Sequence, residues 1–156
     1  MATSVYIESS VISYLTARAS RDLVSSARQA ITLEWWENHR SLFDMYISVL
    51  VEEEIASGDP SAAKRRLEAV AKIRSLDISV EAQQLAEHLI SSSAIPENSP
   101  EDALHIGIAA ANGVDFLLTW NFRHINNAQT KAIIEEVIEQ HDLVCPILCS
   151  PEELGA

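Results

Sequence analysis

The chain has 156 residues, of which 47% are apolar, four are glycine and five are proline. This composition is typical of one compact domain covering residues 1–156, and it excludes a disordered or low-complexity protein. The net charge of −12 disfavours tight non-specific binding to nucleic acid, which depends on a surplus of basic side chains.

The first part of the chain predicts two strands separated by helical segments. Residues 5–7 form a short β-branched and aromatic run that is typical of a strand, and a helical pattern begins over 11–15. A longer helix is expected over 22–40, where apolar side chains recur every three or four residues. Residues 43–47 predict the second strand.

The rest of the chain alternates helices with short strands. Helices with polar caps are expected after Ser48, Asp59, Ser79 and Ser99, ending near residues 58, 73, 91 and 112. Short strands are expected over 76–78, 116–119 and 143–148, with a further helix over 130–140. This alternation predicts a three-layer α/β/α fold with a mostly parallel central sheet.

The ends of the chain and its cysteines bear on its location. Residues 1–4 lack a basic region, and no apolar stretch is long enough to cross a bilayer, so we expect neither a signal peptide nor contact with a membrane. Cys145 and Cys149 have no second pair to complete a tetrahedral metal site. We therefore expect two reduced thiols in a cytoplasmic protein.

Acidic and polar side chains fall where the predicted strands end and helices begin. Glu8 follows the first strand, and Glu54 lies within two turns of the start of the helix after the second. Asp102 lies in the first turn of its helix, and Asn121 follows the strand over 116–119. Because an open parallel sheet binds ligands at the carboxyl ends of its strands, we expect the four side chains around one cleft. Such a cluster needs Mg²⁺ or Mn²⁺ to offset its repulsion, and it suits metal-assisted hydrolysis of a phosphodiester.

Each of these residues also has a plain structural interpretation. Asp102 with Ser99 fits a capping box, and Asn121 fits a turn. Residues 52–54, three consecutive glutamates, fit a solvated helix face. Glu8 is the hardest to explain in this way, because a lone acid after an apolar strand has no evident structural role.

Four segments of the chain, in order, resemble the motifs of the PIN domain family, to which the VapC-like toxins belong. Residues 5–12 resemble the first motif, with Glu8 where the family usually has Asp and with Ser9 and Ser10 after it. Residues 48–58 resemble the second, in which a glutamate stands six residues after the serine that ends the strand. That spacing selects Glu54 over its two neighbours.

The third and fourth motifs lie in the second half of the chain. Residues 101–111 resemble the third, an Asp that opens an Ala-rich helix. Residues 117–124 resemble the fourth: Thr119 ends the strand, and Asn121 stands at a position that the family fills with Asp or Asn. His124 stands where the toxins often have a second Asp.

The resemblance spans residues 5–125 and implies both a fold and an activity. It implies a sheet of about five parallel strands and RNA cleavage that depends on Mg²⁺ or Mn²⁺. The residues that match the catalytic positions are Glu8, Glu54, Asp102 and Asn121, of which the three acids would hold the metal. It also implies a homodimer and, often, a small antitoxin that blocks the site.

Two alternatives stay open at this stage. Glu8 and Asn121 favour a PIN scaffold that cuts weakly or no longer cuts, and that serves as an RNA- or protein-binding regulatory module. An interaction domain with no site would instead place Glu8, Glu54 and Asp102 far apart. The phosphate-binding motifs G-x-x-x-x-G-K-[ST] and G-x-G-x-x-G do not occur, which argues against P-loop and dinucleotide-binding folds.

Several further side chains are expected near the acids. They are Ser9, Ser10, His105, Thr119, Arg123 and His124, as substrate contacts or as supports of the acids. His105 shares a helix face with Asp102, and it fits either a metal or phosphate contact or a polar residue at the rim. Basic side chains form two clusters, one of Arg18, Arg21 and Arg28 and one over 64–66, and these are the expected contacts for RNA. The adjacent Trp35 and Trp36 are expected in the core or in a dimer interface.

Overall fold

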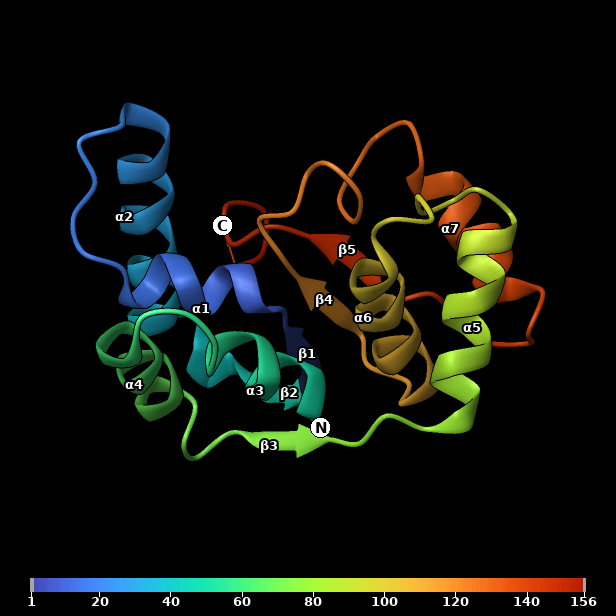
Figure 1. The fold of residues 1–156 in the computed structure, drawn as a ribbon, viewed down its shortest axis with the longest axis horizontal. Helices are drawn as coiled ribbons and strands as arrows, with labels where there is room; N and C mark the ends of the chain where they lie inside the picture. The colour runs from blue at the N-terminus through green and yellow to red at the C-terminus, as the bar shows by residue number, and fades with distance from the viewer. Residues whose placement is uncertain (1, 156) are drawn as a thin grey trace.

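The computed structural model describes residues 2–155 and contains a five-stranded sheet with seven α-helices. The strands are β1 (Thr3–Ile7), β2 (Phe43–Ser48), β3 (Arg74–Leu76), β4 (Phe116–Leu118) and β5 (Ile147–Cys149). The helices are α1 (Ser9–Thr16), α2 (Leu23–Asn38), α3 (Val49–Ile55), α4 (Pro60–Ala69), α5 (Val80–Ser91), α6 (Pro100–Ala111) and α7 (Lys131–Glu139), with a short 3₁₀ helix at Arg40–Leu42 (Figure 1).

The strand order in the sheet is β3-β2-β1-β4-β5, and every neighbouring pair is parallel. The predicted α/β fold with a parallel sheet of about five strands is therefore confirmed. Because all strands run the same way, the residues that follow them meet at one edge of the sheet. β1 lies in the middle of the order, so Glu8 leaves the sheet at the centre of that edge.

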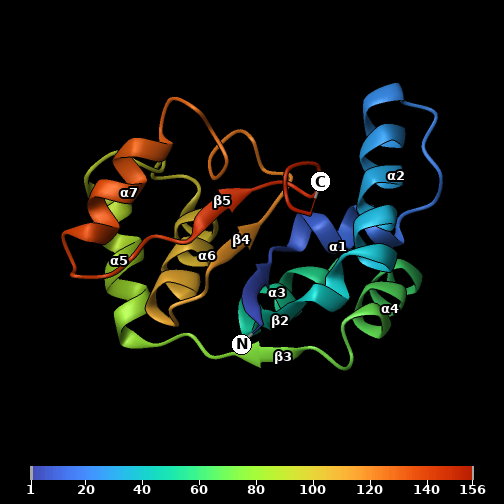
Figure 2. The ribbon, with the colours of Figure 1, turned by 180° about the vertical axis from the view of Figure 1, so that it is seen from behind.

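Both faces of the sheet are covered, as a parallel sheet requires. Tyr6 of β1 contacts His105 of α6, so this face packs against α6. The residues directly before and after Tyr6 face the opposite side of the sheet. On that side, Trp35 of α2 stacks on Phe43 of β2. Helices α3 and α6 lie in front of the strands in Figure 1 and behind them in Figure 2.

The two adjacent tryptophans are covered by their own chain. Trp35 is fully buried and Trp36 is 7% exposed, with the guanidinium of Arg40 5.0 Å from the Trp36 ring centroid. Their burial removes the argument that they need cover from a second subunit.

Local sequence explains where most helices begin. The side chains of Asp22, Ser48, Asp59 and Ser79 each accept a hydrogen bond from a backbone N–H in the first turn of the following helix. The predicted caps at Ser48, Asp59 and Ser79 are therefore confirmed. Ser99 makes no such bond, so the capping-box interpretation of Asp102 is wrong.

Several predicted boundaries differ from the structure, and three of them have a clear physical reason. The third strand ends at Leu76 rather than at residue 78, because β2 ends at Ser48 opposite Leu76 and leaves nothing further to pair with. The last strand begins at Ile147 rather than at 143, because Pro146 has no N–H for the ladder. The fourth helix ends at Ala69 rather than near residue 73, because the chain turns there to enter β3.

None of the helices in the described part of the chain is both long and apolar enough to span a membrane.

Candidate functional site

Two acids and a histidine converge at the carboxyl edge of the sheet. Glu8, Glu54 and His105 each place one potential ligand atom within 4.8 Å of the others. They come from the end of β1, from the last turn of α3 and from the second turn of α6. Glu8 and His105 are buried, while the side chain of Glu54 is 32% exposed, so the cluster opens to solvent at Glu54.

The carboxylate of Glu8 is well supplied with hydrogen bonds. Its Oε1 accepts from the hydroxyls of Ser10 at 2.5 Å and of Thr119 at 2.6 Å. Its Oε2 accepts from the backbone N–H of Ser10 at 3.1 Å, which makes Glu8 the N-cap of α1. Glu8 therefore has a structural role that its sequence context did not reveal.

Glu54 is fixed by a chain of buried polar groups. Its Oε1 accepts from the Ser9 hydroxyl at 2.5 Å and lies 2.6 Å from Nε2 of His105. The other ring nitrogen of His105 lies 2.7 Å from the Tyr6 hydroxyl, which lies 2.7 Å from the Ser48 hydroxyl. This chain fixes the orientation of the imidazole and, through it, of the carboxylate.

The pKa shifts of His105 and Glu54 favour an ion pair between the two side chains. Burial alone lowers the pKa of His105, but its hydrogen bond to Glu54 and the charges of Glu8, Glu54 and Asp102 outweigh that effect and raise the pKa. Burial raises the pKa of Glu54, and the contacts with His105 and Ser9 outweigh it, so the net shift is downward. The imidazolium thus offsets part of the repulsion between the carboxylates.

Asp102 lies outside this three-residue cluster, although α6 also carries His105. Its Oδ2 lies 2.7 Å from Nδ1 of His124. The side chain of Asp102 is 21% exposed and that of His124 is 19% exposed. At this edge of the sheet the structure thus pairs Glu54 with His105 and Asp102 with His124.

The side chain of Asn121 supports the loop that follows β4. Its Oδ1 accepts a hydrogen bond from the backbone N–H of His124 at 3.0 Å. This contact agrees with the prediction that Asn121 is a turn residue. Its backbone N–H donates to Thr119 Oγ1 at 2.9 Å. Arg123 is exposed, and its side chain forms no hydrogen bond with the described residues.

Sequence reasoning missed Tyr6 and understated His105. A tyrosine inside an apolar strand was a usable indication, because a buried hydroxyl needs a partner. Glu52 and Glu53 are exposed, whereas Glu54 points to the cluster, as the motif spacing selected.

The carboxylates of Glu8, Glu54 and Asp102 are the type of ligand that suits a hard divalent cation. Carboxylate oxygens are the ligands that Mg²⁺ and Mn²⁺ prefer. Oε2 of Glu54 and Oδ1 of Asp102 accept no hydrogen bond from residues 2–155, so each keeps free lone pairs. His105 uses both ring nitrogens on Tyr6 and Glu54, which suits an orienting group better than a ligand.

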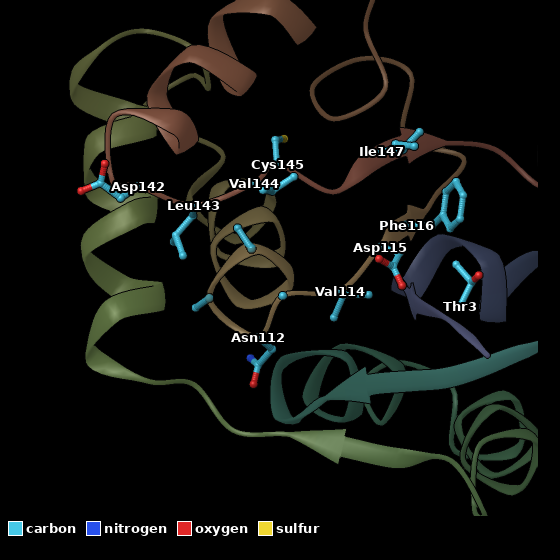
Figure 3. Close-up of a pocket in the computed structure, with 13 residues that line it drawn as sticks. Thr3, Asn112, Val114, Asp115, Phe116, Asp142, Leu143, Val144, Cys145 and Ile147 are labelled. Carbon is cyan, nitrogen blue, oxygen red and sulfur yellow. The ribbon is translucent and has the colours of Figure 1, made fainter. Parts of the chain in front are cut away.

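A cavity lies at the opposite edge of the sheet. It has a volume of about 960 Å³ and is lined by residues at the amino ends of β1, β4 and β5, including Thr3, Phe116 and Ile147 (Figure 3). None of the candidate site residues lines it. This cavity is therefore separate from the acidic site.

Comparisons with known proteins support the fold. No family model matches the chain, and no curated protein matches its sequence. A chain of the crystal structure of VapBC2 from Rickettsia felis, bound to a DNA fragment from their promoter, matches with a TM-score of 0.54 and 16% identity. The match covers 95% of this chain and 98% of that one, so the two share a fold over nearly their whole lengths.

Proposed function

We propose that the chain is a metal-dependent endoribonuclease of the PIN toxin type, which hydrolyses RNA phosphodiester bonds. The observation that carries the proposal is the convergence of Glu8, Glu54 and His105 at the carboxyl edge of the sheet. The four motifs of the sequence and the similarity in fold to a chain of VapBC2 support it. We propose Glu8, Glu54 and Asp102 as the ligands of Mg²⁺ or Mn²⁺.

In the proposed activity, each residue of the site would have a distinct role. A bound divalent cation supplies an activated water at neutral pH and steadies the leaving oxygen. His105 orients Glu54, and His124 orients Asp102, each at hydrogen-bond distance. Ser10 and Thr119 hold Glu8, and Ser9 holds Glu54. The exposed Arg123 is placed to meet a phosphate of the RNA beside Asn121.

The proposal extends to partners. The VapBC2 structure contains its chains bound to a DNA fragment from their promoter, and this supports a small antitoxin as a partner of the present chain. We also propose a cytoplasmic location, where RNA is accessible, and a homodimer. Light scattering at micromolar concentration tests the dimer, and a monomeric mass would contradict it.

A specific observation favours a second candidate, a scaffold that no longer cuts and binds RNA or protein. Three hydrogen bonds already occupy the Glu8 carboxylate, and the Asn121 side chain is used in a turn. Glu8→Asp separates the two candidates, because a shorter ligand changes metal affinity or cleavage, whereas a mere cap changes only stability. If neither metal affinity nor cleavage changes, the scaffold is the better account.

The experiment for the enzyme is cleavage of a labelled single-stranded RNA with Mn²⁺. We expect slow cleavage by the wild type and none by Glu54→Gln or Asp102→Asn, because neutralising a ligand removes the cation. Glu53→Gln is the matched control: it removes the same charge from an exposed position on the same helix, and it should cleave like the wild type. Equal cleavage by Glu54→Gln and Glu53→Gln would refute the proposed site.

A further inference from the structure

An arginine enclosed by three aromatic rings lies beside the acidic site. The guanidinium carbon of Arg28, on α2, is 5.2 Å from the ring centroid of Phe122, 5.4 Å from that of Trp120 and 6.0 Å from that of Tyr14. Trp120 is buried, while Phe122 is 37% exposed. Arg28 and Tyr14 are half-buried, so the cluster presents an exposed aromatic ring beside a partly accessible cation.

The positive charge of Arg28 is not neutralised by a carboxylate. Within residues 2–155, Arg28 forms no salt bridge, and its one side-chain hydrogen bond is a long one to the Tyr14 hydroxyl at 3.4 Å. Hydrogen bonds with Ser25 are the main cause that lowers the pKa of Asp22, and the charge of Arg28 adds to this effect without forming an ion pair. Most N–H groups of the guanidinium thus remain available to a ligand.

The cluster is connected to the acids by hydrogen bonds. The backbone N–H of Trp120 donates to the Ser10 hydroxyl at 2.9 Å, and that hydroxyl donates to Glu8. Phe122 follows Asn121 directly in the chain. Trp120 and Phe122 therefore lie at the same edge of the sheet as Glu8, and the cluster that they form with Arg28 adjoins the acidic site.

We propose that Arg28 and Phe122 form a nucleotide subsite for single-stranded RNA, an inference that rests on the proposed function. The guanidinium binds a phosphate, and the exposed Phe122 ring stacks on the adjacent base. Bases in a duplex are already stacked on each other, so the subsite selects unpaired nucleotides. Tyr14 and Trp120 hold the guanidinium in place by cation–π contacts.

The test is binding of a fluorescent single-stranded RNA to the full chain, measured by anisotropy in EDTA so that no cleavage occurs. We expect Arg28→Met to weaken binding about 10-fold and to reduce the slope of log affinity against log salt by about 0.7, the value for one lost phosphate contact. Phe122→Leu keeps an apolar side chain but should weaken binding roughly 5- to 150-fold through lost stacking.

Arg40→Met is the matched control. It removes the same charge and also breaks a cation–π contact, with Trp36, but Arg40 precedes the amino end of β2, away from the acids. If Arg28 only ties α2 to its neighbours, Arg28→Met will lower stability and leave affinity and salt slope like those of Arg40→Met, which overturns the subsite.

The outcomes also separate the subsite from the proposed activity. Cleavage with Mn²⁺ but unchanged RNA affinity in Arg28→Met and Phe122→Leu refutes the subsite and leaves the ribonuclease intact. Weakened binding in both variants without cleavage by the wild type supports the subsite in a non-cutting scaffold. No RNA binding by the wild type refutes the subsite outright.

Discussion

Glu54 shows how helix geometry identifies one glutamate among three. It follows the buried Leu50 and Val51 by four and three residues, so it shares their face of α3. The sequence could therefore predict that Glu54 points inward while Glu52 and Glu53 face solvent. The partners of these acids could not be predicted in the same way. His105 and Tyr6 are 99 residues apart, and only the packing of α6 on β1 brings them together.

Tyr6 gives a test of the buried chain at the level of one hydroxyl. Tyr6→Phe leaves the Nδ1 atom of the buried His105 without its partner, and we expect a loss of about 1–2 kcal/mol in the free energy of unfolding. We also expect Mn²⁺ affinity to fall about 10-fold, because Glu54 loses an orienting contact. Urea unfolding and metal titration measure the two effects.

Tyr46→Phe is the matched control for this prediction. Tyr46 lies next to Tyr6 in the sheet, and its hydroxyl makes no hydrogen bond within residues 2–155. That variant should behave like the wild type. If Tyr6→Phe does so as well, the buried chain contributes nothing to the site.

Helices are easier to predict from this sequence than short strands. A cap and a proline mark the start of α4, and a cap marks the start of α5; these are local properties of the chain. The strands β3 and β5 have three residues each, and their limits depend on where a neighbouring strand ends or where a proline removes a donor. Such limits are set by pairing, which local patterns do not contain.

Helix α6 carries both Asp102 and His105, and a glycine lets it approach α5. A Cβ at Gly107 would lie 2.4 Å from the carbonyl oxygen of Ala82, which is an overlap with backbone. Gly107→Ala gains about 1 kcal/mol of helix propensity, but we expect a net loss of roughly 1–3 kcal/mol because α5 and α6 must separate. Urea unfolding measures it, and a variant as stable as the wild type would contradict the close packing.

The turn after β5 is tied to the loop after β4 by Glu153. Its Oε1 accepts from the N–H and the hydroxyl of Ser150 and from the side chain of Asn126. Burial raises the pKa of Glu153, but these hydrogen bonds outweigh it, and the net pKa falls below the ordinary 4.5. The ionised carboxylate therefore stabilises the fold above pH 4.5, and this contribution is lost as pH falls through the lower, folded-state pKa.

Glu153→Gln tests this pH dependence. Because Glu153 is exposed, we expect the variant to be only about 0.5 kcal/mol less stable than the wild type at neutral pH. The difference should shrink as the wild-type carboxylate becomes protonated below its folded-state pKa. Urea midpoints measured from pH 7 to pH 3 give the result, and a difference that stays constant over that range would show that the charge of Glu153 has no role.

The charge distribution over the protein sets the conditions for any contact with RNA. The net charge is −12, and in the described part of the chain every salt bridge of a carboxylate involves a histidine. The arginines beside the acidic site, Arg28 and Arg123, are therefore free to meet phosphate. Affinity for RNA should depend on these few cations, because the acidic surface as a whole repels the polymer.

The proposed activity requires Glu54, together with Glu8 and Asp102, to hold a divalent cation. Calorimetric titration of the purified protein with Mn²⁺ measures this binding. We predict saturable binding to the wild type and to Glu53→Gln, and no measurable binding to Glu54→Gln, because a neutral amide in place of the carboxylate removes a charged ligand. The same Mn²⁺ affinity in Glu54→Gln and the wild type, or no binding to the wild type, would contradict the claim.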